Sequence, residues 1–190
     1  MRKPIIAGNW KMNKTAAEAV ALVEELKPLV AKAKPEVVVC VPFTDLAAVG
    51  KALEGSKIKL GAQNVAWADK GAFTGEISAE MLKELGVEYV IIGHSERRQY
   101  FGETDESVNK RVKQALANGL KPIVCVGETK LEREKNRTKR VLKKQITEGL
   151  AGVENFENLV VAYEPVWAIG TGLTATAEDA NATIGYIRRI

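Results

Sequence analysis

The sequence predicts an α/β protein in which a parallel sheet is covered by helices. Short apolar runs alternate with longer segments of helical period, and successive runs are separated by about the length of one β-α-β unit. The runs are apolar at nearly every position, which is typical of strands buried on both faces of a parallel sheet. An open doubly wound sheet and a β/α barrel both have this pattern, and both place reactive groups where strands end.

Six runs are expected to be strands, at 5–8, 37–41, 58–61, 89–93, 120–126 and 159–163. The expected helices between and after them span 15–33, 44–53, 78–85, 105–118, 138–150 and 176–190. Side-chain oxygens able to cap a helix occur at Thr15, Thr44, Ser78 and either Thr104 or Asp105. Gly86 and Gly119 follow helical runs, as left-handed helix ends require. No linker or low-complexity tract interrupts residues 1–190, so we expect a single domain.

Composition excludes several classes of function. The chain has 28 Lys and Arg against 24 Asp and Glu, and this small excess is spread along the sequence, so we expect no nucleic-acid partner. The basic start reaches Asn9 and Lys11 too soon for a signal peptide, and no stretch approaches the ~20 apolar residues of a membrane span. Cys40 and Cys125 lie within apolar runs and are expected to be buried and free, which suits a soluble protein of the reducing cytoplasm.

Candidate reactive residues lie where strands end. His94, the only histidine, follows the run 89–93, and Ser95 is expected to cap a short helix whose amino end keeps the ring uncharged. Glu164 follows the run 159–163 and precedes Pro165 and a loop that is first apolar and then glycine-rich. Such a loop can cover a carboxylate, exclude water and raise its proton affinity, so Glu164 is a candidate base.

Asn9 and Lys11 follow the first strand. A lysine on the same rim as His94 and Glu164 would supply positive charge to an anionic substrate and to a developing oxyanion. Each of these residues has an ordinary structural explanation when taken alone, because a lone histidine is more often structural and a lysine or glutamate is more often solvated. No GxGxxG follows the first strand and no P-loop occurs, so the usual nucleotide-binding motifs are not found.

Five segments in order resemble the triosephosphate isomerase family. They are GNWKMN at 8–13, GAQNVAWADKGAFTGEIS at 61–78, GHSERRQYFGETDE at 93–106, CVGET at 125–129 and AYEPVWAIGTGLTAT at 162–176. The resemblance implies a TIM (β/α) barrel and the interconversion of dihydroxyacetone phosphate and glyceraldehyde 3-phosphate, without a cofactor or a metal. It makes an unrelated doubly wound binding protein a remote alternative.

The resemblance also implies roles for individual residues. This family is itself the standard example of a glutamate base paired with an uncharged histidine, so these roles come from the family. Glu164 matches the base and His94 the electrophile, while Asn9 and Lys11 match groups that stabilise the enediolate. Ser95 and Glu96 match residues that support these groups, Glu96 being paired near Lys11. The matching lid runs from 165 to 174 and includes Trp167, Ile169, Gly170, Thr171 and Gly172, with the Gly170 amide directed at the phosphate. Phe73, Thr74 and Gly75 match a loop that enters a partner subunit, which implies a homodimer.

The sequence departs from the family pattern in length. A complete barrel needs ~250 residues, so we expect an incomplete barrel of six parallel strands with surrounding helices. Three of the four backbone donors that the family offers to the phosphate have no counterpart among these residues. At roughly 1.5 to 3 kcal/mol for each bond to a charged group, their loss removes on the order of 4 to 9 kcal/mol of binding energy. We therefore expect impaired phosphate binding, and open first and sixth strands that promote association into homodimers or higher homo-oligomers. The alternative is a catalytically inactive fragment or self-assembly module.

Overall fold

The computed structural model describes residues 3–190, and its six strands are parallel and hydrogen-bonded in chain order, β1-β2-β3-β4-β5-β6. This confirms the predicted parallel α/β class with six strands and surrounding helices. The strands are β1 (Ile5–Asn9), β2 (Glu36–Val41), β3 (Lys59–Ala62), β4 (Tyr89–Ile92), β5 (Lys121–Val126) and β6 (Val160–Tyr163). Every predicted strand is present, with ends that differ by one residue at most. Among the described residues, β1 and β6 each pair with a single neighbour.

The helices also follow the predicted order. They are α1 (Ala16–Val30), α2 (Leu46–Ala52), α3 (Ala79–Glu84), α4 (Ser95–Tyr100), α5 (Asp105–Ala117), α6 (Lys130–Glu134), α7 (Thr138–Gly149) and α8 (Ala177–Ile187). Two short 3-10 helices, η1 (Phe43–Asp45) and η2 (Val166–Ala168), follow β2 and β6. Within residues 3–190, none of these helices is both long enough and apolar enough to cross a membrane.

Most of the predicted helix ends are confirmed. Ser78 accepts a hydrogen bond from the Met81 amide, and Thr104 accepts one from the Ser107 amide. Gly86 and Gly119 have positive φ angles of 78° and 72°. Thr44 does not cap the second helix, because the chain first forms η1 and α2 then begins after Asp45.

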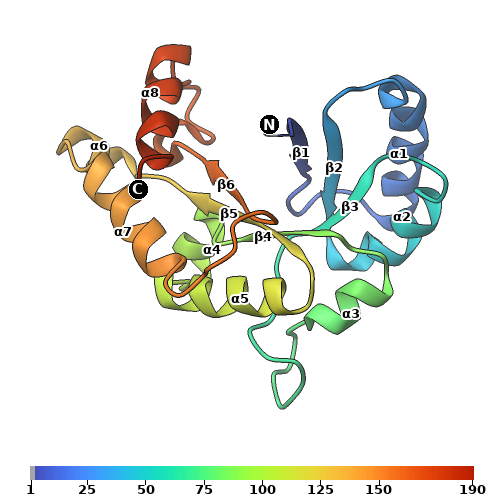
Figure 1. Cartoon of the computed structure of the whole chain (residues 1–190). Coiled ribbons are helices and arrows are strands. Elements are labelled where there is room, and N and C mark those ends of the chain that lie inside the picture. The colour runs from blue at the N-terminus through green and yellow to red at the C-terminus, as the bar shows by residue number, and fades with distance from the viewer. Residues whose placement is uncertain (1–2) are drawn as a thin grey trace. The chain divides into compact units, whose positions relative to one another are not determined.

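The chain divides into two compact units, and the single domain expected from the sequence stays a prediction. The first unit comprises Met1–Ile91 and Gln114–Pro122. Its helices α1 and α2 pack beside β2 and β3 (Figure 1) over a core that includes Val38, Leu46 and Val49. Cys40 lies in this core and is free and buried, as predicted. β1 is more open, and the Ile6 side chain is 61% exposed.

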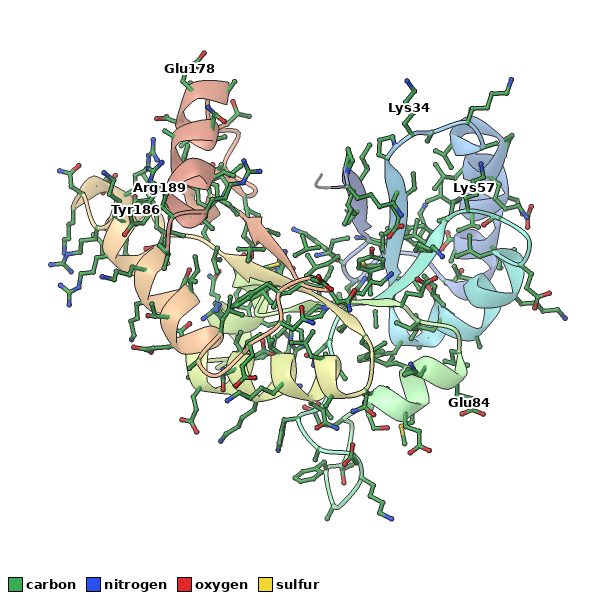
Figure 2. The ribbon with its side chains drawn as sticks, viewed as in Figure 1. Lys34, Lys57, Glu84, Glu178, Tyr186 and Arg189 are labelled. Carbon is green, nitrogen blue, oxygen red and sulfur yellow. The ribbon has the colours of Figure 1, made fainter. Side chains whose placement is uncertain are left out.

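The second unit comprises Ile92–Lys113 and Ile123–Ile190, and it contains His94 and Glu164. Its buried apolar side chains include Ile92, Val108 and Leu142, and Cys125 is likewise buried and outside any disulfide. Helix α8 packs on α7 (Figure 2), where the Tyr186 hydroxyl donates to the Lys139 carbonyl at 3.2 Å. β5 and β6 pair in register up to Val126 and Tyr163, so Glu164 follows directly at the carboxyl end of the pair.

Candidate active site

A glycine turn at the end of β4 sets the position of His94. Gly93 has a φ of 72°, and a Cβ on it would lie 2.7 Å from a Val108 methyl, so both the conformation and the space require glycine. Arg98 donates from Nε to the Gly93 carbonyl at 2.8 Å, and its guanidinium pairs with Asp105 at 2.6 Å. The backbone immediately before the imidazole is therefore held by a charged and nearly buried side chain.

His94 itself caps helix α4, which corrects the prediction that Ser95 does so. The His94 Nδ1 atom accepts the Glu96 amide at 3.2 Å, and Ser95 is the first residue of the helix. A ring nitrogen that accepts a hydrogen bond carries no proton, so the hydrogen-bond network assigns the proton of a neutral ring to Nε2. A proton on Nδ1 would make this nitrogen a donor facing the Glu96 N–H, which is also a donor, and the capping hydrogen bond would be lost. The Glu96 carboxylate lies 3.5 Å from the same atom and forms no hydrogen bond with it in this tautomer.

Glu164 lies against this imidazole. Its backbone amide donates to the Val126 carbonyl at 2.9 Å, which continues the β5–β6 pairing by one residue. Its Oε2 lies 3.0 Å from His94 Nε2, and its Oε1 accepts the Ser95 amide at 2.7 Å. The Ser95 amide is one of the donors that the start of a helix leaves unpaired, so α4 supplies a hydrogen bond to one carboxylate oxygen, while the His94 ring lies beside the other.

The surroundings of Glu164 raise its affinity for a proton. The side chain is 16% exposed. Burial raises the pKa of Glu164 above its ordinary value, although the nearby His94 and the Ser95 amide act in the opposite direction. The carboxylate borders a cavity of about 310 Å³ that is also lined by Gly127, Gln145 and Cys125. A partly desolvated carboxylate beside an imidazole is suited to moving protons at neutral pH.

Asn9 and Lys11 lie together in the first unit, directly after β1. Lys11 has a φ of 54°, which is a strained conformation for lysine, and its amide donates to Asn9 Oδ1 at 3.0 Å. Gln63 Nε2 donates to the carbonyls of Lys11 and Cys40, both at 2.9 Å. Sequence reasoning missed this function of Gln63, although it lies within a matching segment. The approach of Asn9 and Lys11 to His94, and the pairing of Lys11 with Glu96, stay predictions.

The loop after Glu164 is anchored by a buried carboxylate that sequence reasoning also missed. Glu128 is fully buried and accepts the Trp167 indole N–H at 3.0 Å. The Tyr163 hydroxyl lies 3.0 Å from both of its oxygens, and the Arg133 guanidinium stacks 4.3 Å from the Trp167 ring centre. The start of the predicted lid is therefore fixed to α6 and β6. CVGET showed a glutamate after β5, but nothing in the local pattern indicated that it would be buried.

The remaining lid residues, which follow Trp167, are more exposed. Gly170 and Gly172 have φ angles of 70° and 75°. Between them, Thr171 donates from its hydroxyl to the Trp167 carbonyl at 2.8 Å and accepts the Leu173 amide at 3.3 Å. Ile169 links η2 to this turn. The structure thus has a glycine-flanked turn at the predicted place, and its closure over a phosphate stays a prediction.

The predicted dimer loop protrudes from the first unit. The loop between β3 and α3 extends past α3 (Figure 1), and a hydrogen bond of 2.8 Å from the Ala66 amide to the Ile77 carbonyl closes its base. The Phe73 ring makes an edge contact with Trp67 at 5.2 Å, while Thr74 and Gly75 are exposed. Insertion of this loop into a partner subunit stays a prediction. Within residues 3–190, no group of three or more His, Cys, Asp or Glu side chains is arranged to hold a metal ion.

Comparison with known proteins identifies one family. A sequence profile described as "Triosephosphate isomerase" matches residues 4–190. The chain is 62% identical over 192 residues to the protein of that name from Alkaliphilus oremlandii, covering 100% of this chain and 77% of the relative. It is 62% identical over 190 residues to the protein of that name from Thermoanaerobacter pseudethanolicus, covering 99% and 77%. The crystal structure of triosephosphate isomerase from Bartonella henselae is similar with a TM-score of 0.90 and 40% identity, covering 99% of this chain and 75% of that one.

Proposed function

Since the chain belongs to the triosephosphate isomerase family, we propose that it interconverts dihydroxyacetone phosphate and glyceraldehyde 3-phosphate through an enediolate. One observation carries the proposal. His94 accepts the Glu96 amide at Nδ1 and meets the Glu164 carboxylate at Nε2, so an imidazole and a partly desolvated carboxylate lie 3.0 Å apart. These are the two groups that a proton transfer between adjacent carbons requires.

The proton transfer conserves every atom of the substrate. Glu164 removes a proton from C1 of the ketose, the C1–H electrons form a C1–C2 double bond, and the carbonyl electrons move to the C2 oxygen. The Nε2–H of His94 donates a hydrogen bond to that oxygen, and the ring transfers a proton from the C1 hydroxyl to it. Return of the carbon-bound proton from Glu164 to C2 gives the aldehyde. Asn9 and Lys11 stabilise the negative charge that develops on the oxygens.

Substrate binding must replace contacts that the two groups now make with each other. In the structure, Glu164 Oε2 lies beside His94 Nε2, and Oε1 accepts a hydrogen bond from the Ser95 amide. In the complex, the substrate oxygen takes the place of Oε2 beside His94 Nε2, and the freed carboxylate turns to the carbon. The lid of residues 165–174 then closes from its Trp167 anchor, excludes water and directs the Gly170 amide to the phosphate.

We further propose that these 190 residues bind the phosphate weakly. The described residues form six strands, and by the family pattern they offer one of four backbone donors. A loss on the order of 4 to 9 kcal/mol corresponds to roughly three to six decades in kcat/KM. A slow reaction is still expected, because the proposed base Glu164 lies 3.0 Å from His94 and accepts the Ser95 amide within these residues.

We also propose that the chain forms a homodimer or higher homo-oligomer in the cytoplasm. Its small-molecule substrate would be a triose phosphate. The exposed Phe73 to Gly75 segment supports pairing of subunits, and the open β1 edge, with Ile6 61% exposed, supports further association. Cys40 and Cys125 are both outside any disulfide, which is ordinary for a reducing compartment.

A coupled isomerase assay on the purified 190-residue chain tests the proposal, with Glu164→Gln and His94→Ala as controls. Both substitutions should abolish the measured rate. A rate that neither substitution changes comes from a contaminant and would remove the catalytic proposal in favour of an inactive self-assembly module. Added peptide that supplies the two further β-α units of the family should raise the rate if the phosphate donors are what limits it.

A further inference from the structure

Gly127, directly after β5, lies against the backbone of Glu164. A Cβ built on Gly127 would be 1.8 Å from the Glu164 carbonyl oxygen and 2.9 Å from its carbonyl carbon. Gly127 does not have a positive φ, so close approach of the two main chains, rather than backbone conformation, requires glycine here. Any displacement of Gly127 is therefore passed directly to the residue that carries the proposed base.

Gln145 on α7 holds Gly127 with both ends of its amide. The Gly127 N–H donates to Gln145 Oε1 at 2.9 Å, and Gln145 Nε2 donates to the Gly127 carbonyl at 3.1 Å. The backbone fixes which end of the amide is oxygen, because the opposite orientation would set donor against donor and acceptor against acceptor. An amide side chain carries both the acceptor that the Gly127 N–H needs and the donor that the Gly127 carbonyl needs. Leu142, one turn earlier on α7, is fully buried and fixes the helix to the core.

The geometry of the carboxylate makes this clamp relevant to chemistry. Glu164 must keep its oxygens within hydrogen-bond distance of the Ser95 amide and of His94 Nε2, at 2.7 and 3.0 Å. Its backbone is fixed on one side by the Val126 carbonyl and on the other by contact with Gly127. Gln145 and Glu164 also border the same cavity of about 310 Å³, so loosening of Gly127 admits water beside the carboxylate.

We propose that Gln145 is a positioning residue for Glu164, acting through the backbone of Gly127. The inference rests on the proposed function, because it assigns Gln145 a part in placing the base of that reaction. Gln145 makes both of its hydrogen bonds to the Gly127 backbone, so its effect on the proposed reacting groups, Glu164 and His94, is indirect. Its removal should therefore change how fast bound substrate reacts and leave substrate binding nearly unchanged.

The test compares Gln145→Glu with the matched control Lys143→Ala, an exposed position on the same helix. The glutamate keeps the shape of the side chain but sets an oxygen against the Gly127 carbonyl. We expect kcat to fall roughly 10- to 100-fold, since a misplacement near 1 Å has effects of that size. KM should stay within about twofold, and the control should keep both values. Gln145→Ala is the second variant, because it removes the clamp without adding charge and leaves room for a water.

A second readout separates this proposal from the proposed function. The chain has one histidine, so nitrogen NMR of its imidazole follows the ionisation of Glu164 through Nε2 without any turnover. In the charge-neutral Gln145→Ala variant the midpoint should fall toward the ordinary glutamate value, because the carboxylate gains water. A folded Gln145→Ala variant that keeps this midpoint, or a loss of activity through KM alone in either variant, would overturn the positioning function. An inactive unmodified chain would count against the proposed function, and the NMR midpoint alone would then decide on Gln145.

Discussion

Replacing Gly127 by alanine should displace Glu164 and lower both activity and stability. The new Cβ would start 1.8 Å from the Glu164 carbonyl oxygen, and real Cβ atoms essentially never approach closer than 3.0 Å. The two backbones must therefore separate by at least 1.2 Å. Both sides resist this movement, because Gly127 is held by Gln145 and Glu164 by the Val126 carbonyl.

The size of the effect follows from this displacement. Overpacking of a tight contact costs about 1 to 3 kcal/mol of folding free energy, and a shift near 1 Å at a reacting group costs roughly 100-fold in rate. We expect the Gly127→Ala variant to lose about these amounts in urea unfolding and in kcat. The matched control is Gly185→Ala in α8, where a new Cβ would lie 3.8 Å from the flexible end of the Arg189 side chain and helix propensity favours alanine by about 1 kcal/mol. A Gly127→Ala variant as stable and as active as the unmodified chain would refute the reasoning.

Other consequences can be measured on the same protein. Because the pKa of Glu164 is raised in the folded state, the folded chain holds that proton more tightly, and the free energy of unfolding should fall as the pH rises above the ordinary value of 4.5. The Glu164→Gln variant should lack this component of the pH dependence, and identical urea-derived profiles would contradict it. Tyr163→Phe leaves the buried Glu128 carboxylate short of a donor and should cost about 1 to 3 kcal/mol in urea unfolding, whereas an unchanged midpoint would show that the hydroxyl is dispensable. Burial raises the pKa of Cys40 to about 12, so iodoacetamide at pH 8 should label it only after unfolding, and rapid labelling of the native chain, located by mass spectrometry, would be the opposite result. Light scattering should show association at micromolar concentration, and a well-behaved monomer would count against the open-edge argument.

The order and type of the main elements could be predicted because each is a local pattern. Apolar runs identified the strands, and glycines such as Gly86 and Gly119 marked helix ends through their backbone freedom. Helix α6 was missed, since its five residues are too few for a hydrophobic period to show. The capping of α4 by His94 was also missed, because the hydroxyl of Ser95 was the more usual acceptor and nothing local distinguished the two.

The sequence singled out His94 and Glu164, which the structure brings to 3.0 Å of one another, but it did not indicate the residues that hold the neighbouring backbone. His94 and Glu164 stand out because each follows an apolar run at the end of a strand. Gln63 bonds to Lys11, Glu128 to Trp167 and Gln145 to Gly127. These hydrogen bonds join residues that are 18 to 52 positions apart in the sequence. A polar side chain that bonds to a distant backbone leaves no periodic signal in the sequence, so these contacts became visible only in the folded chain.

The most direct test of the central claim is deuterium incorporation from heavy water into dihydroxyacetone phosphate by the 190-residue chain. This measurement detects removal of the carbon-bound proton even when turnover is slow. Glu164 acting as the base predicts deuterium at C1 with the unmodified chain and none above background with Glu164→Gln. Absence of deuterium with the unmodified chain, or equal incorporation with the variant, would contradict the claim.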